Sequence, residues 1–514
     1  MRLGHRGRGC GVTVDTLNVF LLAGALVLIA AVVAVRVSLK LGLPSLVLYL
    51  LIGVAIGESG LGVQFSDPDI ARSFAYAALI VILAEGGLTT QWDEVRPVFG
   101  IGLSLATVGV VVSTAVVAVI GHYLLGLDWL PAILLGAIFA PTDAAAVFST
   151  LRRLPLRRRL SGALEAESGL NDAPAIVLVT ILSASHGPDD GFLMIGLTVV
   201  YELLGGAGLG YVVGRVGAAI LRRTALPASG LYPLVVLTLT MLAYGVGAFA
   251  HMSGFAAVYI AALVLGNSHL PHRAATRSFV EGLAWLAQIG LFVMLGLLSS
   301  PSDMPGAFVT AVVAGAVLTF VARPISVWAA TAPFLMSVRE KVFVSWAGLR
   351  GAVPVVFATI PLAEGVERAE WLFAVVFIVS VLYTLIQAPT LPWLATRLGM
   401  VPAFPTRDAD VESAPLERLD ADLIHVRVPP GSKLHGVEIA ELRVPQGVGV
   451  ALIVRGDTSM VPGPRTKLLQ GDEILIVAPR ALRRATEARL RAVGRRGRLA
   501  GWFGERGGAE PDDD

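Results

Sequence analysis

Long apolar stretches with few charges recur along most of the chain, which leaves few folds open to it. A helix of about 20 apolar residues crosses the hydrocarbon core of a bilayer, because its backbone polar groups are satisfied within the segment. Only 15% of the 514 residues are charged, and the mean hydropathy is +0.74. Apolar runs of spanning or near-spanning length lie near residues 17–35, 43–57, 73–88, 97–121, 130–151, 160–184, 192–220, 231–250, 254–267, 278–298, 306–333, 341–362 and 371–395. The sequence therefore predicts an all-α polytopic membrane domain over residues 17–397, with about thirteen transmembrane helices.

Basic residues are distributed unequally between the loops that join these runs. In membrane proteins the cytoplasmic loops carry the excess of Lys and Arg. Loops after even-numbered runs carry only Arg72 and Arg368. Loops after odd-numbered runs carry Arg36, Lys40, Arg96, Arg152, Arg153, Arg157, Arg158, Arg159, Arg222, Arg223, Arg273, Arg277, Arg339 and Lys341. We therefore expect a multi-pass protein of a prokaryotic cytoplasmic membrane, with its N-terminus outside and its C-terminus in the cytoplasm.

Residues 1–16 form a basic arm before the first apolar run. That run is long enough to span, and no small-residue cleavage motif follows it, so we interpret it as a transmembrane helix rather than a signal peptide. The charges of the arm oppose the predicted orientation, and a translation start near Val12 would remove them. Cys10 is the only cysteine, so an internal disulfide is excluded.

The composition changes after residue 397. Residues 398–416 are polar and contain three prolines, which is typical of a linker. Residues 417–481 contain three short alternating segments, LIHVRV at 423–428, VGVALIVR at 448–455 and DEILIVAP at 472–479, separated by turn sequences. They predict a small α+β domain. The last segment, 482–514, is low in apolar residues, and we expect it to be a disordered tail.

Charged side chains inside apolar spans are costly, so each one is a candidate functional residue. The sixth run contains the sequence ESGLND at 167–172. Helical spacing places Ser168 over Asp172 and Glu167 over Asn171, as two neighbouring polar stripes. A monovalent cation requires several oxygen ligands of this kind. We interpret Asp172 as the carboxylate that takes part in ion transport.

Two other runs combine a charge with a proline. The fifth run contains Pro141 next to Asp143, and the twelfth contains Arg350 four residues before Pro354. Proline removes a backbone hydrogen bond and interrupts a helix. The two runs hold corresponding positions when runs 1–6 are compared with runs 8–13. Interrupted helices in matching positions are typical of inverted repeats with an ion site at the middle of the membrane.

Glu85, Glu167 and Arg350 are three further charges inside the apolar runs. Glu85, in the sequence LAEGG of the third run, is interpreted as an ion ligand or a proton site, and a structural role is the alternative. Glu167 and Arg350 have opposite charges, and we interpret them as a buried ion pair with a structural role.

Four motifs in order resemble one transporter family: APTDAAAV, ESGLNDAPAIV, HMSGFAAVYIAALVLGN and GLRGAVPVV. Residues 17–397 resemble the sodium/proton and potassium/proton exchangers (NhaP-like) of the cation/proton antiporter superfamily. The resemblance implies two inverted six-helix repeats with crossing broken helices, assembled as a homodimer. It implies a transporter and not an enzyme, with K⁺ or Na⁺ and H⁺ as substrates and no cofactor.

The resemblance also assigns roles to individual positions. The paired Asn171 and Asp172 are associated with electroneutral one-for-one exchange. The ion and proton ligands implied by the family are Glu85, Thr142 through its backbone carbonyl, Ser168 and Asp172. The supporting shell implied by the family consists of Asp143 with Asn171, and of Glu167 with Arg350.

Residues 417–481 resemble the TrkA-C type regulatory domain of potassium channels and uptake systems. Exchangers with such a domain are often potassium/proton antiporters, so the resemblance favours K⁺, with Na⁺ as the alternative. A small cytoplasmic anion such as a nucleotide is an expected ligand of the domain, and nucleic acid is not an expected partner. The basic residues available to such an anion are Arg427, Lys433, His435, Arg455 and Arg465, with ordinary surface charge as the alternative for each.

Two other functional classes are disfavoured by missing motifs. A potassium channel would need a filter sequence of the TVGYG kind, which is absent. A membrane hydrolase would need a G-x-S-x-G elbow or an H-E-x-x-H motif, and neither occurs.

Overall fold

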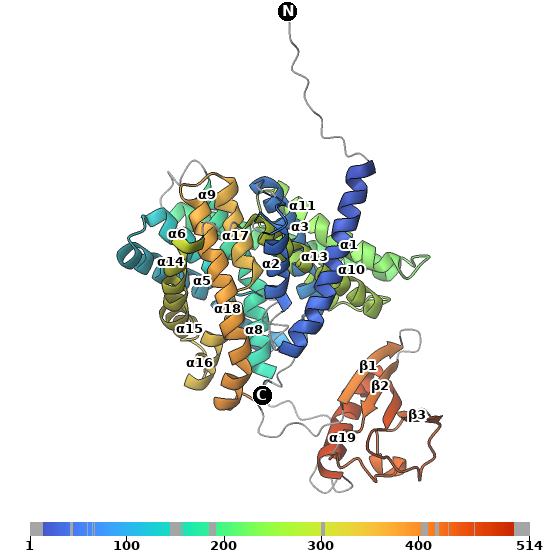
Figure 1. The fold of residues 1–514 in the computed structure, drawn as a ribbon. Helices are drawn as coiled ribbons and strands as arrows, with labels where there is room; N and C mark the ends of the chain where they lie inside the picture. The colour runs from blue at the N-terminus through green and yellow to red at the C-terminus, as the bar shows by residue number, and fades with distance from the viewer. Residues whose placement is uncertain are drawn as a thin grey trace, which may run out of the picture. The chain divides into compact units, whose positions relative to one another are not determined.

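The computed structural model describes residues 14–41, 45–58, 60–63, 67–143, 158–184, 192–299, 304–401, 410–416, 421–429, 431–456 and 458–497, with residues 65 and 156. The chain divides into two compact units (Figure 1). The first comprises residues 1–270 and 275–401, and the second comprises residues 402–514 with the short segment 271–274. Three predicted features lie wholly or partly outside the described residues. They are residues 1–13 of the arm, Arg152, Arg153 and Arg157 of the basic cluster, and residues 498–514 of the tail.

The described part of the first unit is helical. Its elements are α1 (Val14–Leu41), α2 (Ser45–Ile56), α3 (Pro68–Thr89), α4 (Trp92–Val95), η1 (Arg96–Val98), α5 (Phe99–Leu125), α6 (Trp129–Phe139), α8 (Arg158–Leu170), α9 (Asp172–Ser183), α10 (Phe192–Arg223), α11 (Leu231–Phe249), α12 (Gly254–Gly266), α13 (Arg273–Leu298), α14 (Met304–Val317), η2 (Leu318–Ala322), α15 (Arg323–Ala330), α16 (Val338–Ala347), α17 (Ala352–Ala363) and α18 (Ala369–Arg397).

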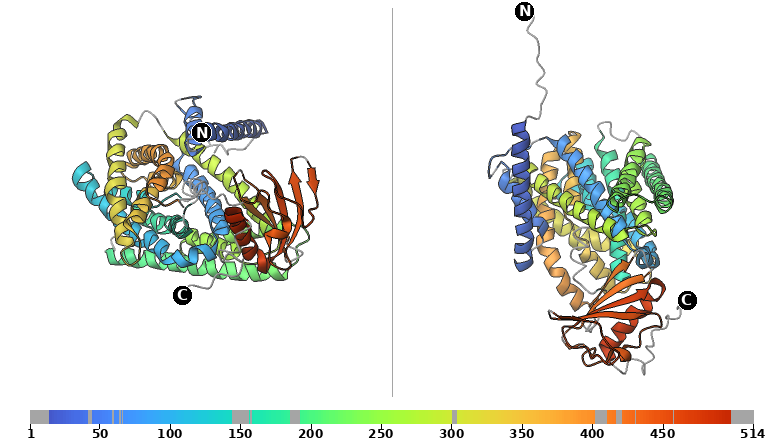
Figure 2. Two further views of the ribbon diagram at one scale, coloured as in Figure 1. Left: turned by 90° about the horizontal axis from the view of Figure 1, so that it is seen from below. Right: turned by 90° about the vertical axis from the view of Figure 1, so that its right-hand side faces the viewer.

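Helices of the first unit pack in two groups. α12 packs against α3, α10 and α11, whereas α5 packs against α6, α8 and α15, and α18 packs against α14 and α17. Figure 2 shows the helices from two further directions. α3 and α17 also pack together and join the two groups. The side chains between these helices are largely Ala, Val, Leu and Phe, and many are buried, as a multi-pass bundle requires.

The helix lengths agree with a membrane-spanning unit. Among the described residues, seven helices are long and apolar enough to cross a bilayer, and α16 with α17 forms a further pair bent by 54°. Four shorter apolar helices, α6 and α12 among them, add to these. The polytopic all-α prediction is confirmed. The count of thirteen spans stays a prediction.

Prolines account for three interruptions in these helices. α6 ends at Phe139, two residues before Pro141, and residues 348–351 separate α16 from α17. Both interruptions were predicted. The sixth run was predicted as one helix, but it divides at Asn171 into α8 and α9. Pro174 is the third residue of α9, so the hydrogen bond that would reach the Leu170 carbonyl is missing.

The second unit has a five-stranded antiparallel sheet with the strand order β1-β2-β5-β3-β4. Its strands are β1 (Asp410–Leu416), β2 (Ala421–Arg427), β3 (Gly449–Arg455), β4 (Thr458–Met460) and β5 (Glu473–Pro479). The central strands β2, β3 and β5 are the three that the sequence predicts. β1 corrects the predicted linker, because residues 410–416 pair with β2 along their whole length. β4 corrects a predicted turn.

The predicted tail needs a second correction. Helix α19 (Arg483–Arg496) follows β5 and packs against it (Figure 1). Leu490 and Val493 of this helix are fully buried in the core that β2, β3 and β5 also form. The α+β unit therefore continues past the predicted boundary at 481 to residue 497.

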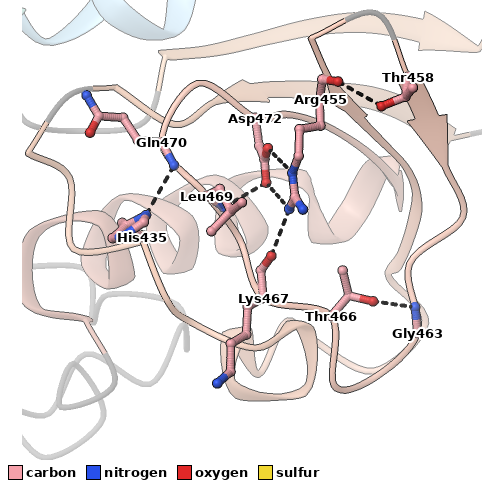
Figure 3. Close-up of polar contacts among 9 residues, drawn as sticks. All are labelled: His435, Arg455, Thr458, Gly463, Thr466, Lys467, Leu469, Gln470 and Asp472. Carbon is pink, nitrogen blue, oxygen red and sulfur yellow. Dashed lines mark hydrogen bonds and ion pairs between the residues drawn. The ribbon is translucent and has the colours of Figure 1, made fainter.

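One ion pair holds the segment before β5. The Arg455 guanidinium donates from Nε to Asp472 Oδ1 and from Nη2 to Oδ2, both at 2.8 Å, and Nη2 also donates to the Lys467 carbonyl at 2.9 Å (Figure 3). The Leu469 N–H donates to Asp472 Oδ2 at 2.7 Å. Burial by itself would raise the pKa of Asp472, but the bonds from Arg455 and Leu469 outweigh it and lower this pKa below 3.8.

This contact predicts a pH-dependent stability of the second unit. Asp472→Asn should lower the free energy of unfolding of residues 402–514 by about 1–3 kcal/mol at neutral pH, because a buried charged acceptor is lost. A carboxyl whose pKa is lower in the folded state stabilises the fold above its unfolded pKa, and the contribution is lost as the pH falls through the folded pKa. Urea unfolding at pH 7 and near pH 3 measures the difference, which should shrink at the lower pH.

A matched control is Glu473→Gln. Glu473 is 40% exposed and contacts His425 at 3.3 Å and Arg427 at 3.9 Å, so its loss should cost less than about 1 kcal/mol. Equal effects of the two substitutions would contradict the role of Asp472.

Candidate ion-binding site

The two predicted interruptions meet in the first unit. The Asp143 backbone N–H donates to the Leu349 carbonyl at 2.9 Å, and the Ala352 N–H donates to Asp143 Oδ2 at 2.7 Å. Ala352 is the first residue of α17, so the Asp143 carboxylate caps that helix. A Cβ atom at Gly351 would overlap the Asp143 carboxylate, so only glycine allows this approach. The non-helical residues 140–143 and 348–351 are therefore hydrogen-bonded to each other.

Asn171 connects the sixth run to this crossing. Its Nδ2 donates to Thr142 Oγ1 at 2.7 Å, and both side chains are buried. The resemblance implied a pairing of Asn171 with Asp143, but the amide bonds instead to the neighbouring Thr142. Asn171 therefore holds the end of α8 against the residues that follow α6.

Asp172 lies next to this contact as the first residue of α9. Its side chain is 2% exposed. Within the described part of the chain, neither Asp172 Oδ1 nor Asn171 Oδ1 has a hydrogen-bond partner. A buried carboxylate oxygen without a donor is costly unless a proton or a cation reaches it. The two oxygens belong to adjacent residues and form the centre of the candidate site.

The other predicted ligands come from different segments of the chain. Thr142 accepts from Asn171, and Ser168 is fully buried one turn before Asp172, with its hydroxyl donating to the Leu164 carbonyl at 2.9 Å. Glu85 lies on another helix, α3, and its side chain is half-buried. The crossing therefore brings Thr142, Ser168 and Asp172 to one region, and the inclusion of Glu85 as a ligand remains a proposal.

The predicted partner of Glu167 is wrong. Arg323 Nη1 lies 2.6 Å from Glu167 Oε1, and the two side chains are 5% and 2% exposed. Arg323 begins α15, its Nη2 donates to the Val344 carbonyl at 3.4 Å, and its guanidinium lies against Gly348. Sequence reasoning missed Arg323, although a basic residue within the apolar run 306–333 was the available signal.

Arg350 is buried at the crossing, with 1% of its surface exposed. Its carbonyl accepts from Thr384 Oγ1 at 3.2 Å. Its Nε and Nη1 atoms have no hydrogen-bond partner among the described residues. Arg323 takes the predicted place beside Glu167, and the guanidinium of Arg350 interacts electrostatically with Glu167 and Asp172 without a direct ion pair among the described residues.

Comparisons with protein families match the two units separately. Residues 26–397 match the family described as sodium/hydrogen exchanger, transmembrane. Residues 423–491 match the TrkA-C domain, a range that includes most of α19. The first match covers more than two thirds of the chain.

Curated relatives carry transport names. The chain is 33% identical to the K(+)/H(+) antiporter NhaP2 of Shewanella sp. (strain ANA-3) over 472 residues, which cover 90% of this chain and 82% of that protein. It is 36% identical to the K(+)/H(+) antiporter NhaP of Alkalimonas amylolytica over 392 residues, 74% of this chain and 67% of that protein. It is 26% identical to the Na(+)/H(+) antiporter NhaH of Halobacillus dabanensis, over 73% of this chain and 97% of that protein.

A solved structure has a similar fold. The sodium proton antiporter MjNhaP1 from Methanocaldococcus jannaschii superposes with a TM-score of 0.65 at 22% identity, over 74% of this chain and 99% of that one. At this identity the likeness supports the arrangement of the helices.

The Glu167–Arg323 contact predicts a large stability effect. Arg323→Ala leaves Glu167 buried without its partner, which should cost about 3–5 kcal/mol. Thermal unfolding of the purified protein in detergent measures the loss, and the double variant Arg323→Ala/Glu167→Gln should recover part of it.

The matched control is Arg72→Ala. Arg72 contacts Glu364 at 2.6 Å, but the side chains are 27% and 37% exposed, so the cost should stay below about 1 kcal/mol. If Arg323→Ala unfolded no earlier than Arg72→Ala, the buried pair would not stabilise the unit.

Proposed function

The chain belongs to the sodium/hydrogen exchanger family and is a cation/proton antiporter, and we propose that it exchanges K⁺ for H⁺ one for one at Asp172. The observation that carries this site is the buried Asp172 carboxylate, whose Oδ1 has no hydrogen-bond partner within the described residues. One carboxylate can hold either a proton or a monovalent cation, and competition between the two becomes exchange when the site opens to each side of the membrane in turn.

Further oxygen ligands complete the proposed site. The Asp172 carboxylate would be joined by Ser168, by the backbone carbonyl of Thr142 and by Glu85 of α3. Hard monovalent cations are held by several oxygen ligands of low total charge. Asp143 and Asn171 position these ligands, because one caps α17 and the other bonds to Thr142.

Two observations favour K⁺ as the transported cation. The Shewanella and Alkalimonas relatives, at 33% and 36% identity, are named as K(+)/H(+) antiporters. Residues 423–491 match the TrkA-C domain. The alignment with the Shewanella antiporter covers 90% of this chain, so it extends into this domain. Exchange of Na⁺ is the alternative, supported by the more distant Halobacillus relative at 26% identity.

The second unit is proposed to regulate exchange. We place the protein in a prokaryotic cytoplasmic membrane as a homodimer, with the N-terminus outside and the second unit in the cytoplasm. A small anion such as a nucleotide is the proposed ligand of this unit. Arg455 is already bonded to Asp472, which leaves Arg427, Lys433, His435 and Arg465 for the anion. His435 accepts through Nδ1 from the Gln470 N–H at 3.2 Å (Figure 3).

Asp172→Asn should abolish exchange without preventing insertion, because asparagine keeps the size of the side chain but carries neither the exchangeable proton nor the charge. Purified protein in liposomes loaded with a pH-sensitive dye measures proton movement on addition of K⁺, Na⁺ or Li⁺. We expect K⁺ to drive the largest signal in the wild type and no signal in the variant.

The outcomes of this assay separate the alternatives. A larger response to Na⁺ than to K⁺ would favour the Na⁺/H⁺ alternative. Cation flux that ignored an opposing pH gradient would indicate a channel. Undiminished exchange by Asp172→Asn would remove Asp172 from the mechanism.

Deletion of residues 405–514 should leave exchange intact but change its dependence on pH or cation concentration. A separate unit with its own core can affect transport only by contacting two states of the membrane unit differently. The same liposome assay measures the profiles of the full and truncated chains. If the truncated protein were folded but inactive, the second unit would be part of the transport machinery.

A further inference from the structure

An irregular turn precedes Arg323 within a membrane-spanning helix. The apolar span Pro305–Ala330 has 26 residues, and η2 (Leu318–Ala322) inside it is a π-helical turn. The Arg323 N–H donates to the Leu318 carbonyl, five residues earlier, where an α-helix would use the carbonyl four residues earlier. Such a turn holds one residue more than an α-helical turn, and π-turns are frequent at functional sites.

The burial pattern of this span shows the effect of the extra residue. Before the turn, buried residues recur at helical intervals of three or four: Ala307, Ala311, Ala314 and Leu318. The same intervals would continue at Ile325 and Ala329, but both of these residues are exposed. Ser326 and Ala330 are buried instead, each one position later. Compared with an uninterrupted α-helix, the turn therefore changes the direction of Arg323 by about 100°.

Pro324 explains why the turn forms at this place. It follows Arg323 directly and has no N–H, and in a regular α-helix its ring would clash with the carbonyl of Phe320. A wider turn before the proline relieves this clash. The Phe320 side chain is 69% exposed, so the widened turn does not disturb the core.

Two hydroxyl groups attach the turn to a neighbouring helix. The Thr319 hydroxyl donates to the Gly315 carbonyl at 2.8 Å, and the Tyr383 hydroxyl of α18 lies 2.6 Å from Thr319 Oγ1. The Tyr383 hydroxyl also lies 3.2 Å from the Gly315 carbonyl, and the side chain is 6% exposed. These contacts give the turn a fixed place along its helix.

The direction of Arg323 matters for the proposed ion site. Arg323 pairs with Glu167 of α8 at 2.6 Å. Glu167 directly precedes Ser168, and its carbonyl accepts from the Asn171 N–H at 3.0 Å. The ion pair therefore holds the end of α8 that carries Ser168 and leads to Asp172. An arginine rotated by about 100° could not keep this contact.

We propose that the π-turn η2 directs Arg323 towards Glu167. Pro324 forms this turn, and Tyr383 fixes its place. Pro324 and Tyr383 are positioning residues, because neither is a ligand of the proposed site and both act through the ion pair on the end of α8. The effect on exchange rests on the proposed site at Asp172, whereas the effect on unfolding does not.

Pro324→Ala separates this role from an ordinary effect on the helix. Replacing a proline inside a helix with alanine ordinarily raises stability, because alanine is the better helix former. Here the turn should become α-helical and rotate Arg323 away from Glu167. The midpoint of thermal unfolding should then fall nearly as far as in Arg323→Ala. In a Glu167→Gln background Pro324→Ala should not lower the midpoint, because no ion pair is left to lose.

Deletion of Phe320 tests the reverse change. With one residue fewer, the present bond from Arg323 to the Leu318 carbonyl spans four residues, as in an α-helix, and Arg323 keeps its direction. Pro324→Ala combined with this deletion should therefore regain the wild-type midpoint. The matched control deletes Val312, which is 43% exposed in the regular helix α14. It puts the two parts of α14 out of register and should lower the midpoint with or without Pro324→Ala.

The liposome assay gives a second readout, the K⁺ concentration that half-saturates exchange. Pro324→Ala should raise this concentration by about tenfold or more, because the displacement reaches the proposed ligand on α8. Tyr383→Phe keeps the ring but loses the hydroxyl, and it should give a smaller rise. The variant that combines Pro324→Ala with deletion of Phe320 should return to the wild-type value.

Three results would overturn the proposal. The first is an unfolding midpoint of Pro324→Ala at or above that of the wild type. The second is no recovery when Phe320 is also deleted, and this variant decides if Pro324→Ala alone does not fold. The third is an unchanged K⁺ dependence of a destabilised Pro324→Ala. Wild-type protein without cation-driven proton flux would instead reject the proposed function, and the unfolding measurements would still decide the role of the turn.

Discussion

A charge or a free backbone group placed inside a membrane protein has to be compensated by another part of the same chain. The crossing at Asp143 shows how this requirement organises the first unit. The interruption next to Pro141 exposes backbone groups, and the interruption before Pro354 does the same on α17. Each compensates the other, because the Asp143 N–H reaches the Leu349 carbonyl and its carboxylate receives the Ala352 N–H. The proposed ion site lies beside this contact, where helix ends, polar side chains and buried charges already meet.

Much of this arrangement follows from local sequence. The prolines at 141 and 354 indicate the two interruptions, since a missing N–H acts on the helix that contains it. The three central strands of the second unit are indicated by their alternation. Partner choice is different, because it depends on how distant helices pack. Arg323 and Arg350 are equally basic and both lie in apolar runs, so nothing local tells which of them reaches Glu167. The pair forms because α15, which begins at Arg323, and α8, which carries Glu167, both pack against α5.

The errors in the second unit have a similar physical origin. β1 has the sequence DVESAPL, which is polar and contains proline, and it is a strand because β2 offers it a complete antiparallel edge. α19 is rich in arginine and resembles a solvated tail in composition. Its few apolar residues, Leu490 and Val493 among them, fall on one face and enter the core. In both cases a partner outside the segment overrides a weak local preference, and the composition of the segment itself does not reveal that partner.

Charge balance and ion preference are separable properties of such a site. The proposed occupant of Asp172 is a proton or a monovalent cation, and one carboxylate by itself does not distinguish K⁺ from Na⁺. In the proposed site that distinction would depend on the spacing of neutral oxygens, which residues 140–143 and Ser168 are proposed to provide. Their spacing is fixed by contacts outside the site, such as Asp143 with Ala352 and Asn171 with Thr142. Gly351 has no side chain, which lets the two interruptions approach each other closely. In the proposed site, ion preference would therefore depend on the residues that hold the crossing together as much as on the ligands themselves.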